Sequence, residues 1–463
     1  MFEAYRSHIF LAGLVLLAAS VVLPAPEELG TPGLRCLGIF ATSGLFWVTG
    51  VLPLAVTSLA VLALLPLLGV LETDESFALF GNHSVFFILG ALVLAASMIS
   101  TGLSSRLALH AVRRFGSNAR LFVLGVLVSS ALLSFVMPEH AVAAMLFSVI
   151  LEVAHALKLV PLRSSYGKAL FLALGWGAII GGIATLLGGA RNPLAIAILY
   201  ETTGESIGFF EWIQVAMPLS LTLLAVTAIC LDRLARRENV DIAPCRELLE
   251  RKLAESGPAT PAEKRLMVIG VLTVLAWMTL GHRVGLAEIS ILSVIALFAF
   301  RVADWHSVEE NVNWGIIIMY GGAVALGSAL VDSGAARWLA IQLVSSSLLP
   351  PVLVLMILAA VTIFLTEGIS NSAAVAVVLP IALSLADYEG ISGGKLTVFA
   401  VALPAGLAFC LPMGSPPNAI TYSAGYFRLR DVLLLGMFVK LVGLALMLAS
   451  MIWVWPHLGL TYG

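Results

Sequence analysis

Charged side chains are scarce in this chain. Asp, Glu, Lys and Arg make up 11% of its 463 residues, against roughly 25% in ordinary soluble domains. Hydrophobic residues make up 60%, and long apolar runs recur from end to end. The basic residues lie in short segments between these runs, so no patch for a nucleic acid is expected. The composition predicts an integral membrane protein, all-α, with about 11 spans of roughly 20 residues each.

Cysteines and hydrolase motifs are also few or absent. The four cysteines share no metal-ligand spacing, and no structural disulfide is expected among them: Cys36, Cys230, Cys245 and Cys410. Neither Gly-x-Ser-x-Gly nor His-Glu-x-x-His occurs, which argues against an intramembrane hydrolase. No enzyme activity and no organic cofactor are predicted. The first apolar run, 9–24, lacks a small-residue cleavage site and is interpreted as a retained helix.

Two polar interruptions stand 232 residues apart in the apolar pattern. The first contains Ser134 and continues through Pro-Glu-His at 138–140, and the second runs from Thr366 through Ser-Asn-Ser at 370–372. Each connects two apolar runs directly, which predicts a helical hairpin that enters and leaves the membrane by one side. About 50 residues after each interruption comes a glycine-containing break that ends in Asn192 or Asn418. Paired broken segments in two halves indicate the central site of a transporter.

Loop charge gives the orientation of the two halves. Residues 232–265 contain eight Lys or Arg, which assigns this segment and the N-terminus to the cytoplasm. Counting spans from there places the first hairpin on the cytoplasmic side and the second on the external side, provided that 34–70 crosses twice around Gly50 and Pro53. The predicted organisation is an inverted repeat. The first half, 1–231, contains the hairpin 121–157 and the broken helix 169–199. A cytoplasmic linker follows at 232–265. The second half, 266–463, contains the hairpin 349–386 and the broken helix 396–426.

The second tip carries the ligands that a cation and an anion would need. Ser370, Asn371 and Ser372 offer hydroxyl and amide oxygens, and Gly414 lets backbone approach closely. Oxygen donors on broken helices suit Na⁺, while helix N-termini attract an anion. The pair that begins at Pro416 is expected to stop the preceding helix.

These motifs resemble the divalent anion/sodium symporters, which carry dicarboxylates, citrate or sulfate. The resemblance covers about 34–455 and is most specific in the second half. It implies an elevator-type homodimer in which a transport domain moves against a scaffold, with substrate between the two hairpin tips and one sodium beside each tip. By matching positions, the second sodium site would use Thr366, the Ile369 carbonyl, Asn371 and Gly414. The substrate would contact Ser370, Asn371, Ser372 and Pro416.

The first half departs from the family pattern. Glu139 and His140 replace the expected amide and hydroxyl residues, and Arg191 stands where a proline is expected, while Ser134 and Gly188 are retained. A charge in mid-membrane must be paired. The hypothesis is that Arg191 acts as a tethered cation in place of the first sodium, with Glu139 as its partner and His140 turned toward the substrate. The alternative is a purely structural network in an inactive half-site.

Two further assignments concern isolated residues. Glu367 lies within an apolar run, and a structural or coupling role near the second sodium is expected. Trp47, Trp212, Trp305 and Trp314 fit aromatic belts at the membrane surface.

The sequence predicts a secondary active transporter of a small anion, surrounded by membrane lipid in a bacterial inner membrane and coupled to Na⁺ at the second site. The substrate stays open between a dicarboxylate, sulfate, a sulfonate, a monocarboxylate and bicarbonate. The alternative keeps the fold but is a proton-coupled carrier or an anion exchanger, with Glu139 and His140 titrating. Closed hairpin tips argue against an ion channel.

Overall fold

The computed structural model describes residues 6–115, 118–344, 350–388 and 394–460, and the regular structure in these ranges is helical. The α-helices are, in chain order, α1 (Arg6–Val22), α2 (Gly30–Thr49), α3 (Leu54–Leu67), α4 (Thr73–Phe80), α5 (His83–Ser100), α6 (Leu103–Arg114), α7 (Ala119–Ser134), α8 (Glu139–Ala156), α9 (Ser165–Ala184), α10 (Arg191–Thr203), α11 (Phe209–Ala235), α12 (Ala243–Glu255), α13 (Pro261–Val284), α14 (Leu286–Ala299), α15 (Trp305–Asn311), α16 (Trp314–Asp332), α17 (Ala335–Val344), α18 (Pro351–Gly368), α19 (Asn371–Tyr388), α20 (Gly394–Ala405), α21 (Pro416–Ser423) and α22 (Leu429–Trp453).

Apolar helices of two lengths make up the molecule. Within the described ranges, seven are long and apolar enough to cross a membrane, and seven further apolar helices have only 10–17 residues. The short group includes α7 and α20, and it includes α18 and α19 over the stretches Val352–Gly368 and Asn371–Asp387. Helices this short fall below the length that a bilayer core of about 30 Å requires, and three of them, α7, α18 and α19, end or begin at the polar interruptions.

Both polar interruptions lie between paired helices. In the first half, α7 ends at Ser134 and α8 begins at Glu139, with Pro138 in an extended conformation before it. In the second half, α18 ends at Gly368, Ile369 is extended, and α19 begins at Asn371. In both cases the polar residues form the N-terminal turn of the second helix.

The two broken helices differ from expectation in where they break. The first break spans 185–190, between α9 and α10, and the second spans 406–415, between α20 and α21, so both start earlier than the glycine-containing motifs suggested. Pro416 occupies the first turn of α21 and begins this helix; the expectation that it stops the preceding one was wrong. Proline suits the first turn of a helix because backbone N–H groups there have no intrahelical acceptor, so the N–H that proline lacks costs no hydrogen bond.

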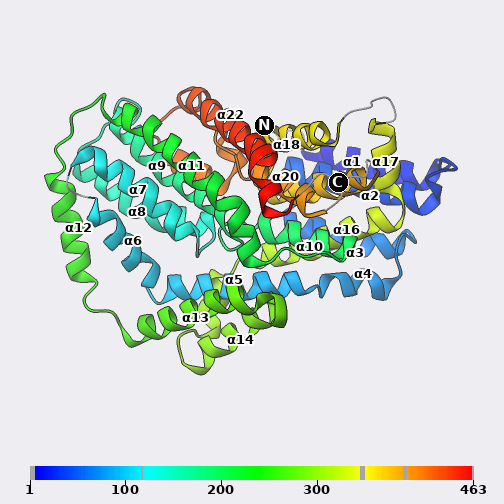
Figure 1. Cartoon of the computed structure of the whole chain (residues 1–463), viewed down its shortest axis with the longest axis horizontal. Coiled ribbons are helices and arrows are strands. Elements are labelled where there is room, and N and C mark those ends of the chain that lie inside the picture. The colour runs from blue at the N-terminus through cyan, green and yellow to red at the C-terminus, as the bar shows by residue number, and fades with distance from the viewer. Residues whose placement is uncertain (1–5, 116–117, 345–349, 389–393, 461–463) are drawn as a thin grey trace.

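Helices from different parts of the sequence gather at each end of the molecule (Figure 1). Helices α7, α8, α9 and α12 gather at one end, and α1, α2 and α17 at the other. Helices α13 and α14 form one edge in this view, and α5 packs beside them on the inner side. The chain reverses between α2 and α3 at Gly50, whose φ of +64° is easily adopted by glycine.

The linker 232–265 is more ordered than a solvated connection. It contains α12, which packs on α6 and α8 and buries Cys245 and Leu249. Arg106 of α6 binds Glu263 at 2.8 Å and donates to backbone carbonyls around Gly257. Burial raises the pKa of Cys245 to about 12, so its thiol is neutral at physiological pH.

Candidate functional site

Four helices begin at one buried polar cluster. Helix α8 starts at Glu139, α10 at Arg191, α19 at Asn371 and α21 at Pro416. Glu139 and Arg191 form an ion pair, and the Asn371 amide lies 3.4 Å from the Glu139 carboxylate. The two hairpin tips therefore meet, and helix N-termini from both halves surround the cluster. Each N-terminus contributes partial positive charge.

The Glu139–Arg191 pair is buried. The distance between Arg191 Nη1 and Glu139 Oε2 is 3.1 Å, and the two side chains are 1% and 7% exposed. Glycines make room for it, since a Cβ at Gly182 would lie 2.1 Å from Glu139 Oε2 and one at Gly406 would lie 2.5 Å from Arg191 Nη2. Because Gly406 belongs to the second break, the Arg191 guanidinium packs across the two halves.

Arg191 also keeps unused hydrogen-bond donors. Its Nε and Nη2 are buried without a hydrogen-bond partner in the described part of the chain. A buried guanidinium donor without a partner is costly. A group that supplied acceptor oxygens at this point would therefore be stabilised.

Backbone contacts tie the first tip to the first break. The Glu139 N–H donates to Gly188 O at 2.8 Å, and the Thr185 hydroxyl donates to Phe135 O at 2.8 Å. The Ser134 hydroxyl lies nearby in the sequence, is buried, and has no partner among the described residues. Glu139 is thus held through its backbone as well as its carboxylate.

The two breaks share one capping pattern. Asn192 donates to the carbonyls 10 and 7 residues before it, Gly182 O at 2.9 Å and Thr185 O at 2.7 Å. Asn418 does the same with Ala408 O at 2.8 Å and Leu411 O at 3.3 Å. In each half the asparagine satisfies carbonyls that the interrupted helix leaves unpaired. This repetition is a structural counterpart of the repeated sequence motifs.

A tryptophan adds a further contact at the first break. Trp212 is fully buried and its indole N–H donates to Ile183 O at 3.0 Å. Trp47 is 3% exposed. The expectation that these two belong to a membrane-surface belt was therefore wrong: Trp212 instead satisfies a carbonyl near the end of α9.

Oxygen-bearing groups converge at the second tip. The Thr366 hydroxyl donates to Ala405 O at 2.8 Å. Neighbouring groups are best satisfied when the Asn371 amide nitrogen faces Thr366 Oγ1 at 2.6 Å, Gly414 O at 2.8 Å and Ala405 O at 3.1 Å. The Asn371 oxygen then accepts from Arg191 Nη1 at 3.2 Å. Of the residues predicted for the second sodium site, Thr366, Asn371 and Gly414 are thus in contact, and Ile369 lies two residues before Asn371.

Glu367 is paired with a residue that the sequence reasoning missed. Its carboxylate lies 2.6 Å from Lys440 Nζ and accepts the backbone N–H groups of 409–411 at 2.8–3.0 Å. Lys440 is fully buried in α22 and also donates to Ile363 O. The signal was available, because a lone lysine inside an apolar run requires a partner.

The remaining predicted substrate residues are more open. His140, Ser370 and Ser372 are half-buried and Pro416 is exposed. The Ser370 hydroxyl accepts from the N–H of Ala373 at 3.2 Å, whereas no hydrogen bond of the His140 or Ser372 side chain is found in the described ranges. Each of the four lies within two residues of a buried group of the site, namely Glu139, Asn371 or Gly414.

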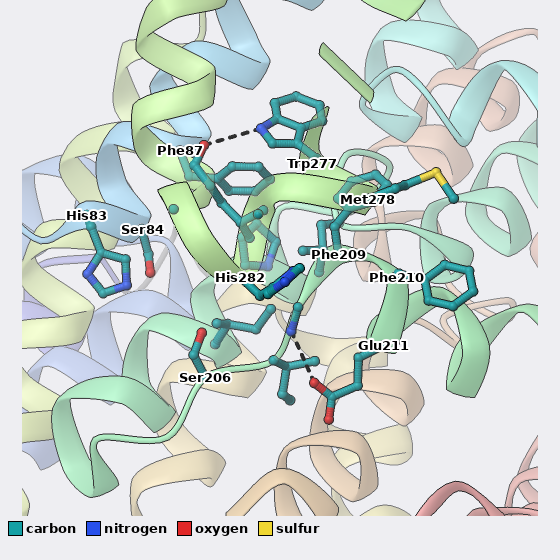
Figure 2. Close-up of a pocket in the computed structure, with 18 of the residues that line it drawn as sticks. His83, Ser84, Phe87, Ser206, Phe209, Phe210, Glu211, Trp277, Met278 and His282 are labelled. Carbon is teal, nitrogen blue, oxygen red and sulfur yellow. Dashed lines mark hydrogen bonds between the residues drawn. The ribbon is translucent and has the colours of Figure 1, made fainter. Parts of the chain in front are cut away.

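A cavity of about 670 Å³ lies between α5 and α13 on one side and α10, α11 and α20 on the other (Figure 2). It reaches the first break at Leu186. His83 and Glu211 lie on different sides of the view, with His282 between them. Glu211 pairs with Lys395 at 2.9 Å. The cavity lies at the boundary between α5 and α13 and the helices α10, α11 and α20.

Comparisons with known proteins agree with this architecture. Sodium-dependent dicarboxylate transporter SdcS of Staphylococcus saprophyticus is 29% identical over 458 residues, covering 93% of this chain and 88% of the relative. SdcS of Staphylococcus aureus (strain bovine RF122 / ET3-1) is also 29% identical, covering 96% and 90%.

Two solved structures have a similar fold at 14% sequence identity. The Alcanivorax borkumensis YdaH transporter gives a TM-score of 0.55 and covers 97% of this chain and 99% of its own. Neisseria gonorrhoeae MtrF, described as belonging to a class of antimetabolite efflux pumps, gives a TM-score of 0.57, with 97% and 95% covered. At this identity the likeness concerns the fold alone.

The family described as the sodium:sulfate symporter transmembrane region matches residues 6–461. This match covers both hairpins, both breaks and the linker. The chain is an integral membrane protein and belongs to the sodium:sulfate symporter family, the divalent anion/sodium symporters that its motifs resemble.

Proposed function

We propose that this protein is a secondary active transporter that carries a small anion across the membrane together with Na⁺. The observation that carries the proposal is the meeting of four helix N-termini from two halves at one buried cluster of Glu139, Arg191 and Asn371. N-termini attract the anion, and the oxygens freed by the breaks bind the cation. The relatives named sodium-dependent dicarboxylate transporters make a dicarboxylate the first substrate to test, with sulfate second.

Na⁺ binds at the second tip in this proposal. In one orientation of the Asn371 amide, its oxygen faces Thr366 Oγ1, Ala405 O and Gly414 O. These three oxygens lie 2.6–3.1 Å from the Asn371 oxygen and can share a cation with it. The Ile369 carbonyl completes the set. Four or five neutral oxygens suit Na⁺, which then neutralises charge on the bound anion.

The Asn371 amide also couples the two halves. With the oxygen turned toward the cation, its nitrogen faces Glu139 at 3.4 Å; with the nitrogen turned inward, its oxygen accepts from Arg191 at 3.2 Å. Sodium binding therefore releases one Arg191 donor from Asn371. Arg191 takes the place of the first sodium as a permanent cation, Glu139 holds it, and the Ser134 and Gly188 positions remain from a lost ion site.

The substrate occupies the rim formed by His140, Ser370, Ser372 and Pro416. Ser372 and His140 supply donors from the first turns of α19 and α8. The buried Arg191 donors that lack a partner would strengthen binding of an anionic group that reached them.

Transport proceeds by an elevator movement in this proposal. Helices α7–α11 and α18–α22 move as a body against the remaining helices, which also form a homodimer, with the N-terminus and linker in the cytoplasm. Support comes from the cavity beside α5 and α13, because an incompletely filled boundary allows sliding with little loss of packing.

A thermal-shift screen tests the function. Purified protein is heated with succinate, citrate, sulfate or bicarbonate, with Na⁺ present or replaced by K⁺. A ligand at 100 times its Kd stabilises by about 2.7 kcal/mol, and we expect this from a dianion only when Na⁺ is present. No stabilisation by any of these anions, or an equal effect in K⁺, contradicts a sodium-coupled anion carrier.

Uptake into liposomes separates the proposal from its rival. In a proton-coupled carrier or an exchanger, an imposed proton gradient or internal anion drives uptake without Na⁺. Buried Glu139 and half-buried His140 are the groups that would titrate. Arg191→Pro and His140→Thr are both expected to lower uptake and alter its sodium dependence; unchanged transport and coupling in both contradicts the role of Arg191 as a tethered cation.

A further inference from the structure

A second cavity of about 670 Å³ lies far from the hairpin tips, between the start of α9, the end of α11 and the start of α22. These helix ends carry charged residues, while the rest of α11 and α22 is apolar apart from Glu211 in the first turn of α11 and the buried, paired Lys440 in α22. The cavity is therefore at the boundary between the bilayer core and water, on the face to which the basic linker is attached.

Basic side chains dominate its lining. Four cationic residues line it, and Asp431 is the one carboxylate among its lining residues. The four are Lys168, Arg233, Arg237 and Arg430. Lys168 binds Asp431 at 2.9 Å. The three arginines are exposed, and within the described ranges no ion pair or side-chain hydrogen bond is found for them.

Nearby carboxylates are already engaged. Asp232 binds Arg120 and Arg236, at 2.8 Å and 2.6 Å. Glu238 accepts from the Ser164 hydroxyl and the Tyr166 N–H at the start of α9. Three arginines around one cavity thus keep their charge available for an external anion.

The rest of the lining is apolar, and part of it lies on the same face of α22 as Arg430. Leu434 and Phe438 of α22 line the cavity and are 83% and 51% exposed, and Leu172, Leu234 and Leu435 lie beside them. Leu434 and Phe438 are four residues apart and share one face of the helix, which continues into the apolar layer. A free inorganic anion would use the arginines alone, whereas a phospholipid would use both the arginines and the apolar residues.

We infer that this cavity binds an anionic phospholipid, with the headgroup phosphate held by Arg233, Arg237 and Arg430 and the acyl chains along Leu434 and Phe438. Arginine suits phosphate because its planar fork donates two hydrogen bonds at once. Basic pockets between helices at the cytoplasmic surface are recognised sites for such headgroups. Because α9, α11 and α22 also carry or adjoin the two breaks, a lipid here would fasten these three helices together.

Native mass spectrometry of the full chain in detergent tests this inference. Phosphatidylglycerol and cardiolipin are compared with phosphatidylcholine on the wild-type protein and on Arg233→Gln/Arg237→Gln/Arg430→Gln. We expect anionic lipids to bind more tightly than phosphatidylcholine, and the triple variant to weaken them by about 100-fold, at about fivefold per arginine. The arginines are exposed, so the variant is expected to fold, which its melting temperature without lipid verifies.

The matched control removes the same charge from elsewhere on the basic segments. Arg113→Gln/Arg114→Gln/Arg251→Gln changes three exposed arginines outside the cavity and is expected to bind lipid as the wild type does. If the control variant bound anionic lipid as weakly as the triple variant does, the loss would reflect general surface charge, and the proposed site would be contradicted. Equal binding of phosphatidylcholine, or equal stabilisation of the wild type by inorganic phosphate, would overturn the phospholipid as its occupant.

Discussion

Glu139 and Arg191 bring an acidic and a basic side chain, in that order, into a part of the protein that is otherwise apolar. Each is tolerable because the other is 3.1 Å away and because glycines allow the two side chains to pack against backbone. Breaking such a pair costs more than its presence contributes, since one buried charge is then left uncompensated.

A double-mutant cycle measures this coupling. Arg191→Met alone is expected to destabilise the protein by about 3–5 kcal/mol, because Glu139 is left unpaired. Arg191→Met/Glu139→Gln should recover much of that loss. Thermal melting of the wild type, Arg191→Met, Glu139→Gln and the double variant in one detergent gives the coupling energy. Additive losses would show that the two side chains do not act as a pair.

Lys440 gives a second prediction at the residue scale. Lys440→Met is expected to cost about 3–5 kcal/mol of stability, because Glu367 loses its cation although it keeps three backbone N–H donors. Since Glu367 Oε2 is only 3.0 Å from where a Cβ of Gly414 would lie, sodium-dependent stabilisation should weaken as well. The matched control is Lys440→Met/Glu367→Gln, which should be more stable than Lys440→Met because no unpaired carboxylate is left. If the double variant were as unstable as Lys440→Met, the pairing would be contradicted.

Among the elements, the two breaks are built alike although their sequences differ. Each is closed by an asparagine that bonds carbonyls 10 and 7 residues earlier. The breaks keep polar backbone satisfied at a depth where water is absent, and they leave helix N-termini directed at the cluster.

We therefore expect Asn192→Ala and Asn418→Ala to have similar effects. Each leaves two buried carbonyls without their donor, at a cost of about 1–3 kcal/mol. Thermal melting measures the loss, and Thr222→Ala, at an exposed hydroxyl on α11, serves as the control for a surface change. A large effect in one half with none in the other would show that the two breaks are not equivalent.

The packing of α12 on α6 and α8 predicts slow chemistry at Cys245. The thiol is fully buried and its raised pKa, about 12, leaves almost no thiolate at pH 7–8. In a background without the other cysteines, we expect maleimide to label Cys245 at least about tenfold more slowly than a cysteine at the exposed position 251 of the same helix. Equal rates would show that the linker is undocked in solution.

For the whole molecule, the proposed elevator makes α11 and α13 members of different bodies. Phe209 of α11 stacks on Trp277 of α13 with ring centroids 5.5 Å apart, and Phe87 of α5 meets the same Trp277 at 5.3 Å. The first contact crosses the proposed sliding boundary, and the second lies within the static part.

A pair of cross-links tests this division. Cysteines at positions 209 and 277, joined by a short reducible bis-thiol reagent, should abolish transport while leaving sodium-dependent ligand binding intact, and reduction should restore transport. Cysteines at 87 and 277 form the matched control and should leave transport unchanged when joined. Full transport by the cross-linked 209–277 protein would contradict movement across this boundary.

Local features of the chain were enough to assign the class of this protein. Scarce charge and long apolar runs required a membrane protein, and the repeated polar interruptions indicated the two hairpins and the family to which the chain belongs. Those features are local, because hydropathy and helix-breaking residues act within a few turns of chain. The starts of α8 and α19 followed from the same local signals.

Which polar groups share a site depended on how the helices pack together. Lys440 lies 73 residues from Glu367 in sequence, Trp212 caps a carbonyl of another helix, and Arg191 packs on Gly406 of the opposite half. The exact start of each break and the docking of α12 also depended on neighbours distant in the chain. Burial forces every charge and carbonyl to find a partner, and packing determines which partner is within reach.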